Sequence, residues 1–196
     1  MFLKVMCSIA QLSKRTYTYK MLILPETIGS AAYITSELDS LKKIKGAMFS
    51  EMVGWGEEWY IKETRNPNTY MNLLAKECCR KFPELKISDF ASLIGNDEYM
   101  FDSVQVGIPS LSLQKYPFEQ YHTSNDAPCH VELSNIQKAH DIIIHMVQSI
   151  ERDRIYKFVH AAPFWMTRYK LYSDYSNEPK DYQKRFSIVL LYIFSI

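Results

Sequence analysis

The sequence predicts an α/β fold in which a doubly wound, mostly parallel sheet is flanked by helices. Short apolar or β-branched runs alternate with segments of helical period from Met1 to Ile150, which is typical of strands joined by helices. A length of 196 residues with 47% hydrophobic content is enough for one compact core. The chain therefore predicts one main domain, followed by a partial helical appendage.

Four segments of the sequence are predicted to form the strands of the main sheet. Each is a run of apolar or β-branched residues bounded by turn-forming residues. In chain order they are Thr18–Leu24, Lys45–Ser50, Lys86–Phe90 and Ser110–Leu113. The Trp-rich segment 55–65 fits either a hairpin or an insertion.

Helical periodicity fills the intervals between these strands. Start signals for helices stand at Ser30, at Asn66-Pro67 and at the capping-box pair Ser134 and Gln137. The predicted helices are a largely buried one over 1–12, Ala31–Leu41, a third carrying Met71 to Phe82, a short piece ending at Phe101, and a long one ending near Ile150.

The composition argues against two classes of partner. Lys and Arg total 23 against 22 Asp and Glu, a formal charge of +1 without a basic stripe, so nucleic acid is not expected. The terminal apolar run Phe186–Ile196 is shorter than the roughly 18 residues that a membrane span needs. The four cysteines, none in Cys-x-x-Cys spacing, predict reduced and mostly buried thiols. These features predict a cytoplasmic protein.

The pattern changes after Arg152. The following segment is rich in Tyr and charge until Tyr182, where an apolar helix is expected to begin. We therefore predict an α/β domain over 1–153, and a linker with the start of an appendage over 154–196.

Three side chains that could carry chemistry each follow a predicted strand. Glu26, Glu51 and His122 should meet at the carboxyl edge of a parallel sheet, where ligands gather. Two carboxylates and an imidazole suit zinc or a similar divalent ion. Simpler interpretations stand beside this one: Glu26 as a helix-entry residue, Glu51 as a solvated strand end, and His122 as a loop histidine bonded to Asp126.

Four motifs together carry a resemblance to a known family. They are Pro25-Glu26-Thr27-Ile28-Gly29-Ser30, Phe49-Ser50-Glu51-Met52-Val53-Gly54, Asn96-Asp97-Glu98 with Gly107-Ile108-Pro109, and Tyr121-His122-Thr123 with Asp126. In this order they resemble the co-catalytic zinc aminopeptidases. The closer resemblance is to their bacterial aminopeptidase-like branch of uncharacterised function, which is often associated with polysaccharide biosynthesis genes and carries a C-terminal winged helix. It runs from about Met1 to Ile150, and Tyr182–Ile196 is similar to the start of the winged helix.

The resemblance implies roles for individual residues. Glu26 would be the general base or a zinc ligand, Glu51 would stand where the family has a ligand aspartate, and His122 would bind the second zinc. Asp97, Tyr121 and Asp126 would lie behind the ligands or against the substrate. The implied reaction is attack of a zinc-activated water on a peptide or amide bond of a small substrate.

The chain departs from the family pattern in two places. The family has two adjacent glutamates where this chain has Glu26-Thr27, so one role is unfilled. The family's first histidine ligand and its bridging acidic residue precede the helix that matches residues 1–12. The expected function is therefore that of a zinc-dependent aminopeptidase-like hydrolase that is incomplete, and weak or inactive, in this chain. The alternative is a catalytically dead binding or scaffold module of the same fold.

Overall fold

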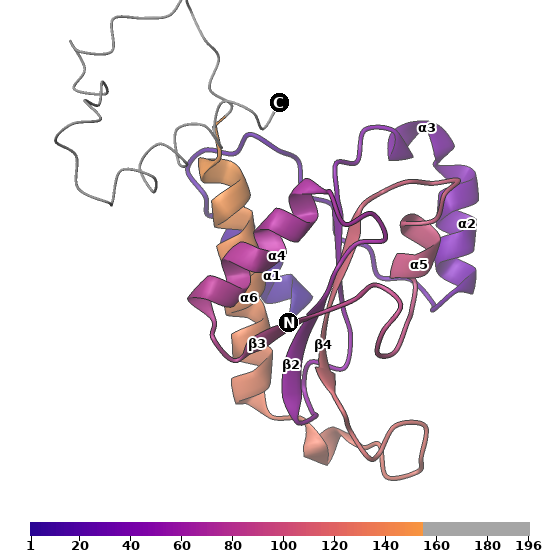
Figure 1. The fold of residues 1–196 in the computed structure, drawn as a ribbon, viewed down its shortest axis with the longest axis vertical. Coiled ribbons are helices and arrows are strands. Elements are labelled where there is room, and N and C mark those ends of the chain that lie inside the picture. Colours follow the sequence, from indigo (N-terminus) through magenta and orange to yellow (C-terminus); the bar gives the residue numbers. More distant parts are fainter. Residues whose placement is uncertain (155–196) are drawn as a thin grey trace, which may run out of the picture. The chain divides into compact units, whose positions relative to one another are not determined.

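A four-stranded mixed sheet lies at the centre of the protein. The computed structural model describes residues 1–154, and Figure 1 shows their fold. The strands are β1 Ala47–Ser50, β2 Glu58–Lys62, β3 Leu85–Ser88 and β4 Ser110–Tyr116. Their order is β1-β4-β2-β3; the β1–β4 and β2–β3 pairs are parallel, and β2 and β4 are antiparallel. The sheet is thus mostly parallel, as the sequence predicts.

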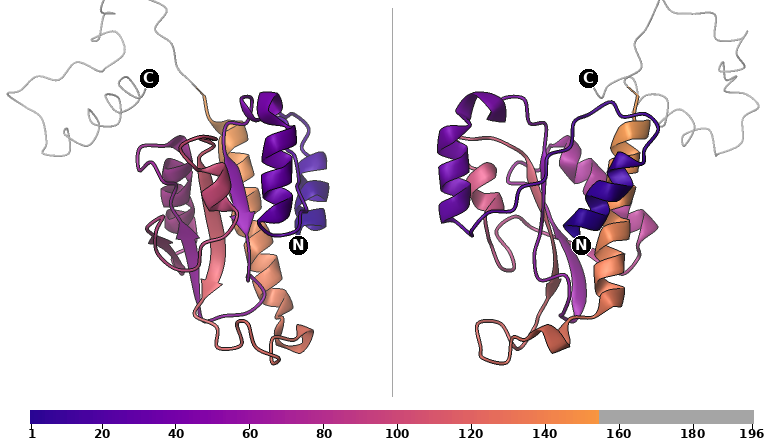
Figure 2. Two further views of the ribbon diagram at one scale, coloured as in Figure 1. Left: turned by 90° about the vertical axis from the view of Figure 1, so that its right-hand side faces the viewer. Right: turned by 180° about the vertical axis from the view of Figure 1, so that it is seen from behind.

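Helices cover both faces of this sheet, which confirms the doubly wound α/β architecture. The helices are α1 Phe2–Ala10, α2 Ile28–Ser36, α3 Leu38–Leu41, α4 Tyr70–Lys81, α5 Glu98–Phe101 and α6 Leu133–Arg152, with a 3-10 turn η1 Pro128–His130. Figure 2 shows α1, α4 and α6 on one side of the sheet and α2, α3 and α5 on the other.

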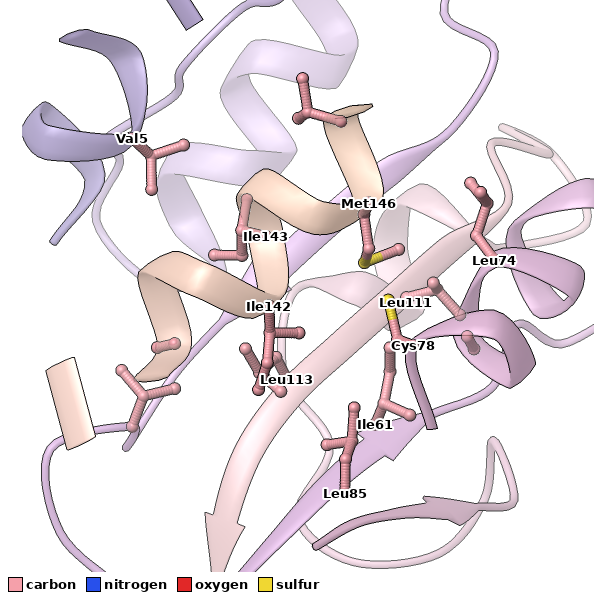
Figure 3. Close-up of a cluster of buried hydrophobic side chains, with 14 of the residues drawn as sticks. Val5, Ile61, Leu74, Cys78, Leu85, Leu111, Leu113, Ile142, Ile143 and Met146 are labelled. Carbon is pink, nitrogen blue, oxygen red and sulfur yellow. The ribbon is translucent and has the colours of Figure 1, made fainter. Parts of the chain in front are cut away.

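The main core lies between the sheet and the layer of α1, α4 and α6. Ile61 of β2 and Leu111 and Leu113 of β4 have no exposed surface. Figure 3 shows them facing apolar side chains of the helices, among them Leu74, Cys78, Ile142, Ile143 and Met146. Each fully buried aliphatic side chain of this kind stabilises a fold by about 1.5–3 kcal/mol, so this face provides most of the hydrophobic stabilisation.

The opposite face of the same strands is buried but polar. Ser112 and Gln114 of β4 and Lys62 of β2 alternate with the core residues and have no exposed surface either. A smaller apolar cluster of Leu41, Phe101 and Ile108 lies beyond them. This polar layer is where the candidate site is built.

The predicted strand Thr18–Leu24 is wrong. These residues form no strand, and Ile23 is 75% exposed. The Glu151 carboxylate of α6 holds the start of this segment and the residues before it. It accepts hydrogen bonds from the backbone N–H groups of Thr16 and Tyr17 and from the Tyr19 hydroxyl. Side-chain contacts with α6, and not a backbone ladder, therefore fix the path of this segment.

The Trp-rich segment is neither a hairpin nor an insertion, because it contains β2. This strand enters the sheet between β4 and β3 and runs antiparallel to β4. As a consequence β1 and β4 end at one edge of the sheet, whereas β2 and β3 end at the other.

Several predicted helix starts are shifted. Thr69 caps α4 because its side chain accepts a hydrogen bond from the Asn72 N–H. The Asn66 side chain instead accepts a hydrogen bond from the Asn68 N–H within the preceding turn. Ser30 lies inside α2, whose N-cap is Thr27. A local side-chain to backbone bond thus fixes the start of α4, whereas the N-cap of α2 has no such side-chain bond.

Two other helix predictions also needed correction. The pair Ser134 and Gln137 forms no capping box, because the Gln137 amide is bonded to Asp141 and His140. The expected helix Ala31–Leu41 is divided into α2 and α3 at Glu37. The long helix itself, α6, is confirmed.

The cysteine prediction was correct for only part of the set. Cys78 is buried and Cys79 is half-buried, but Cys7 and Cys129 are exposed, and all four are free thiols. No helix among the described residues is long and apolar enough to cross a membrane. Residues 1–152 form one compact unit. The predicted winged-helix start and most of the 154–196 appendage lie outside the described residues.

Candidate functional site

Glu51 directly follows β1 and lies over the polar face of the sheet. Ser112 of β4 donates a hydrogen bond to its Oε1 at 3.0 Å, and the Asn96 side-chain amide donates to its Oε2 at 2.5 Å. Burial is the main cause that raises the pKa of Glu51, and the nearby Glu98 carboxylate adds to it; the bonds from Asn96 and Ser112 and the charge of Lys62 oppose this shift. Glu51 is therefore a half-buried, hydrogen-bonded carboxyl group and not a solvated strand end.

The turn 94–98 links Glu51 to the loop that carries Glu26. Asp97 accepts a hydrogen bond from the Thr27 N–H at 2.8 Å and another from the Ser30 hydroxyl at 2.5 Å. Its carboxylate thus lies at the N-terminus of α2, where the helix dipole favours a negative charge. Asn96, which bonds to Glu51, and Asp97, which bonds to the start of α2, are adjacent residues. One turn therefore contacts both loops that carry predicted ligands.

The Glu26 loop is a strained turn. The Ile28 N–H bonds to the Glu26 carbonyl at 2.6 Å, and Thr27 between them has φ 60° and ψ −62°. This is a classic-type γ-turn, which is rare for a β-branched residue and typically costs about 1–3 kcal/mol. The turn places the Glu26 side chain in solvent. Glu26 is therefore the first residue of a strained turn and does not follow a strand.

An ion pair fixes the other side of the turn. Lys62 Nζ lies 2.5 Å from Glu98 Oε1, and both side chains are completely buried. The same ammonium donates to the Ile94 carbonyl at 2.9 Å and lies 4.5 Å from the centre of the Tyr99 ring. The Glu98 carboxylate also accepts a bond from the Asn96 N–H.

His122 lies apart from this network, in the loop after β4. It is exposed, has φ 56°, and stacks on Tyr121 with ring centroids 3.8 Å apart. The strand register explains its position: Ser50 at the end of β1 pairs with Leu113, but β4 continues three residues further, to Tyr116. At about 3.3 Å per residue this carries the loop about 10 Å beyond the end of β1 at Ser50. Asp126 is also exposed in this loop.

The donor types suit zinc, but their arrangement does not. Among residues 1–154, no three His, Cys, Asp or Glu side chains are grouped so that they could hold a metal ion. Both Glu51 oxygens accept hydrogen bonds within the protein. Residues 1–154 therefore do not by themselves form a fitting zinc site, and the roles assigned to Glu26, Glu51 and His122 stay predictions.

Comparison with known families places the chain. Residues 2–153 match a family described as Domain of unknown function (DUF4910). The chain belongs to this family. A protein of Clostridium acetobutylicum named "Putative polysaccharide biosynthesis protein with aminopeptidase-like domain" is 30% identical over 146 residues, which are 73% of this chain and 33% of that protein.

Solved structures confirm the aminopeptidase-like fold of this DUF4910 domain. A "putative peptidase" of Clostridium acetobutylicum has a TM-score of 0.69 and 27% identity, over 75% of this chain and 35% of that one. A zinc aminopeptidase of Bacillus subtilis has a TM-score of 0.54 and 19% identity, over 66% and 34% of the two chains. An aminopeptidase of Aneurinibacillus sp. strain AM-1 has a TM-score of 0.54 and 21% identity, over 70% and 32%. The chain thus spans about a third of the length of the relatives it matches.

The sequence did not predict most of the polar contacts around Glu51 and the 94–98 turn. Ser112 was expected only as part of a strand, and Lys62 stood in a segment with no clear period. The motif Asn96-Asp97-Glu98 was recognised, and Asp97 does lie behind the Glu26 loop. A lysine that follows two alternating apolar residues, Trp59 and Ile61, was the available signal for a buried charge.

Proposed function

We propose that this chain carries part of the active-site edge of a metal-dependent, aminopeptidase-like hydrolase that acts on peptide or amide bonds. The observation that supports this most is the hydrogen-bonded path from Glu51 through Asn96 and Asp97 to Thr27. It connects the two loops that carry the predicted site glutamates, Glu26 and Glu51. Thr27, at the end of this path, has a strained backbone conformation, and such strain persists only where the surrounding structure holds it, here through the Asp97 carboxylate.

Within this proposal the residues of the chain have distinct tasks. Glu26 is exposed at the start of the strained turn, so its carboxylate is free to accept a proton from a water molecule beside a bound substrate. Asp97 holds the turn, and Asn96 and Ser112 orient Glu51. Zinc is the metal we propose for the complete protein, with Glu51 and His122 among its ligands, and the cytoplasm is the proposed location.

We further propose that the 196-residue chain alone is weak or inactive. The reason is the absence of any three-ligand group among residues 1–154. Metal affinity falls with each missing ligand, and with it the capacity to generate hydroxide near neutral pH.

Zinc binding and peptidase activity test this proposal together. The 196-residue chain and a longer version with any in-frame residues encoded before Met1 would be titrated with Zn²⁺ by calorimetry and assayed on aminoacyl amides. We expect the longer version to bind zinc and turn over substrate, His122→Ala to abolish both, and the control His130→Ala to retain both. A longer version that binds no metal would overturn the hydrolase proposal in favour of a scaffold module, and full activity of the 196-residue chain would overturn the proposed incompleteness.

A further inference from the structure

The 94–98 turn is held on the sheet by an unusually large set of buried polar contacts. The Ile94 carbonyl accepts hydrogen bonds from Lys62 Nζ at 2.9 Å and from the Gln114 side chain at 3.3 Å. Glu98 pairs with Lys62 from the other end of the turn. The Lys62 ammonium therefore binds both ends of a five-residue turn at once.

Burial makes this arrangement costly in isolation. Lys62 and Glu98 have no exposed side-chain surface, and replacing such a pair by apolar residues is often neutral or stabilising. Stability alone therefore gives no reason for a charged pair at this point of the sheet. Its geometry does give one, because the two charges fix the backbone between them.

The backbone between Lys62's two contacts holds the two residues that reach the site. The Asn96 backbone N–H donates to the Glu98 carboxylate, and the Asn96 side-chain amide donates to Glu51. Asp97 follows and bonds to Thr27 and Ser30. A displacement of the turn would release the Glu51 carboxyl group and the strained Glu26–Thr27 turn together.

We propose that Lys62, through its buried pair with Glu98, is a positioning residue that sets the Glu51 carboxyl group and the Glu26 loop relative to each other. This inference rests on the proposed function for the importance of those two glutamates. Its structural content is independent of metal or substrate. No hydrogen bond or ion pair joins Lys62 to Glu51 or Glu26, so its positioning effect on them passes through the 94–98 turn.

The test uses the double variant Lys62→Met/Glu98→Leu of the full 196-residue chain. Its apolar pair should leave the urea midpoint close to that of the original chain. Hydrogen exchange of the Thr27 amide should nevertheless become at least about tenfold faster, since it loses a bond to a charged acceptor. The NMR signals of the Asn96 side-chain amide should move towards those of a solvent-exposed asparagine. Core amides such as that of Ile143 should keep their protection.

The matched control is Lys86→Met, which removes an exposed lysine paired at the same 2.5 Å with Glu58 across β2 and β3. It should leave Thr27 and Asn96 unchanged. A stable double variant with unaltered Thr27 and Asn96 signals would overturn the proposal, as would a uniform acceleration at all amides.

If the double variant does not fold, Glu98→Gln decides, because glutamine keeps the volume and one acceptor but loses the charge. The hydrogen exchange of the Thr27 amide should become faster by a smaller factor than in the double variant, and the core amides should stay protected. No acceleration at Thr27 would refute the positioning role. None of these measurements needs zinc or substrate. A longer version of the chain that binds no zinc would therefore contradict the proposed function and leave the positioning result standing.

Discussion

The two faces of strand β4 differ in chemistry although both are buried. Leu111 and Leu113 face α4 and α6 and belong to the apolar core, while Ser112 bonds to Glu51 and Gln114 bonds to the Ile94 carbonyl of the 94–98 turn. The apolar face is non-directional, and its contribution follows the area removed from water. The polar face depends on individual bonds with defined partners. One strand thus joins a layer that stabilises the fold to a layer that fixes positions.

This difference teaches how substitutions should act on each face. A truncation on the apolar face should lower stability and leave the surrounding structure in place. A truncation on the polar face should leave a buried group without its partner, so the loss should depend on which partner remains. Four substitutions would break or sharpen this contrast.

The largest effect is expected from Glu98→Ala. It leaves the Lys62 ammonium buried without its carboxylate, which typically costs about 3–5 kcal/mol of the free energy of unfolding. Urea unfolding followed by circular dichroism would measure it. Glu58→Ala, which removes the exposed partner of Lys86, is the control and should change little. Equal effects of the two variants would remove the distinction between buried and exposed pairs.

The apolar face is tested by Leu113→Ala. This side chain is fully buried among core residues, and its truncation should lower the free energy of unfolding by about 2–4 kcal/mol through lost burial and a residual cavity. Leu133→Ala, at an 82% exposed position, is the matched control. Retained Thr27 amide protection in a destabilised Leu113→Ala protein would sharpen the comparison, and selective loss at Thr27 would break it.

A smaller, pH-dependent effect of opposite sign is expected from Glu51→Gln. Burial raises the pKa of Glu51, so the folded protein retains this proton to higher pH than the unfolded chain does, and the associated stability is lost as pH rises through the raised pKa. Glutamine carries no such proton, and it can accept from Asn96 and donate to the Ser112 hydroxyl.

Thermal unfolding of both proteins between about pH 4 and pH 7 would measure this effect. This range begins near the usual pKa of a carboxyl group and extends above it. The variant should gain stability relative to the original protein as pH rises. Glu98 and Lys62 are the charged groups that face Glu51, so Glu98→Gln in the same background should alter the pH dependence. A constant difference across this range would show that Glu51 has no raised pKa.

The smallest effect is expected from Ile28→Ser. Ile28 is 79% exposed, so its replacement should change the free energy of unfolding by no more than about 0.5 kcal/mol. Chemical denaturation would measure this as well. A loss of several times that size would indicate that the first turn of α2 is covered in solution.

The sequence determined the architecture where the pattern was local. Alternating or continuous apolar runs predicted β1, β3 and β4, and helical spacing predicted α1, α4 and α6 within a few residues, because burial on one face leaves a period in the sequence. The motif set also predicted the family and the aminopeptidase-like fold, which the comparisons confirm. The site roles, including that of Asp97, stay predictions, although Asp97 does bond to the backbone of the Glu26 loop.

Only the tertiary structure decided the rest, since it depends on contacts between residues distant in sequence. Nothing local indicated that β2 would lie antiparallel between β4 and β3, or that Thr18–Leu24 would remain outside the sheet. The pair of Lys62 with Glu98 joins residues 36 positions apart, and Asn96 reaches Glu51 across 45. Such polar contacts have no sequence period, because a charge is tolerated in the interior only when the folded chain brings its partner to it.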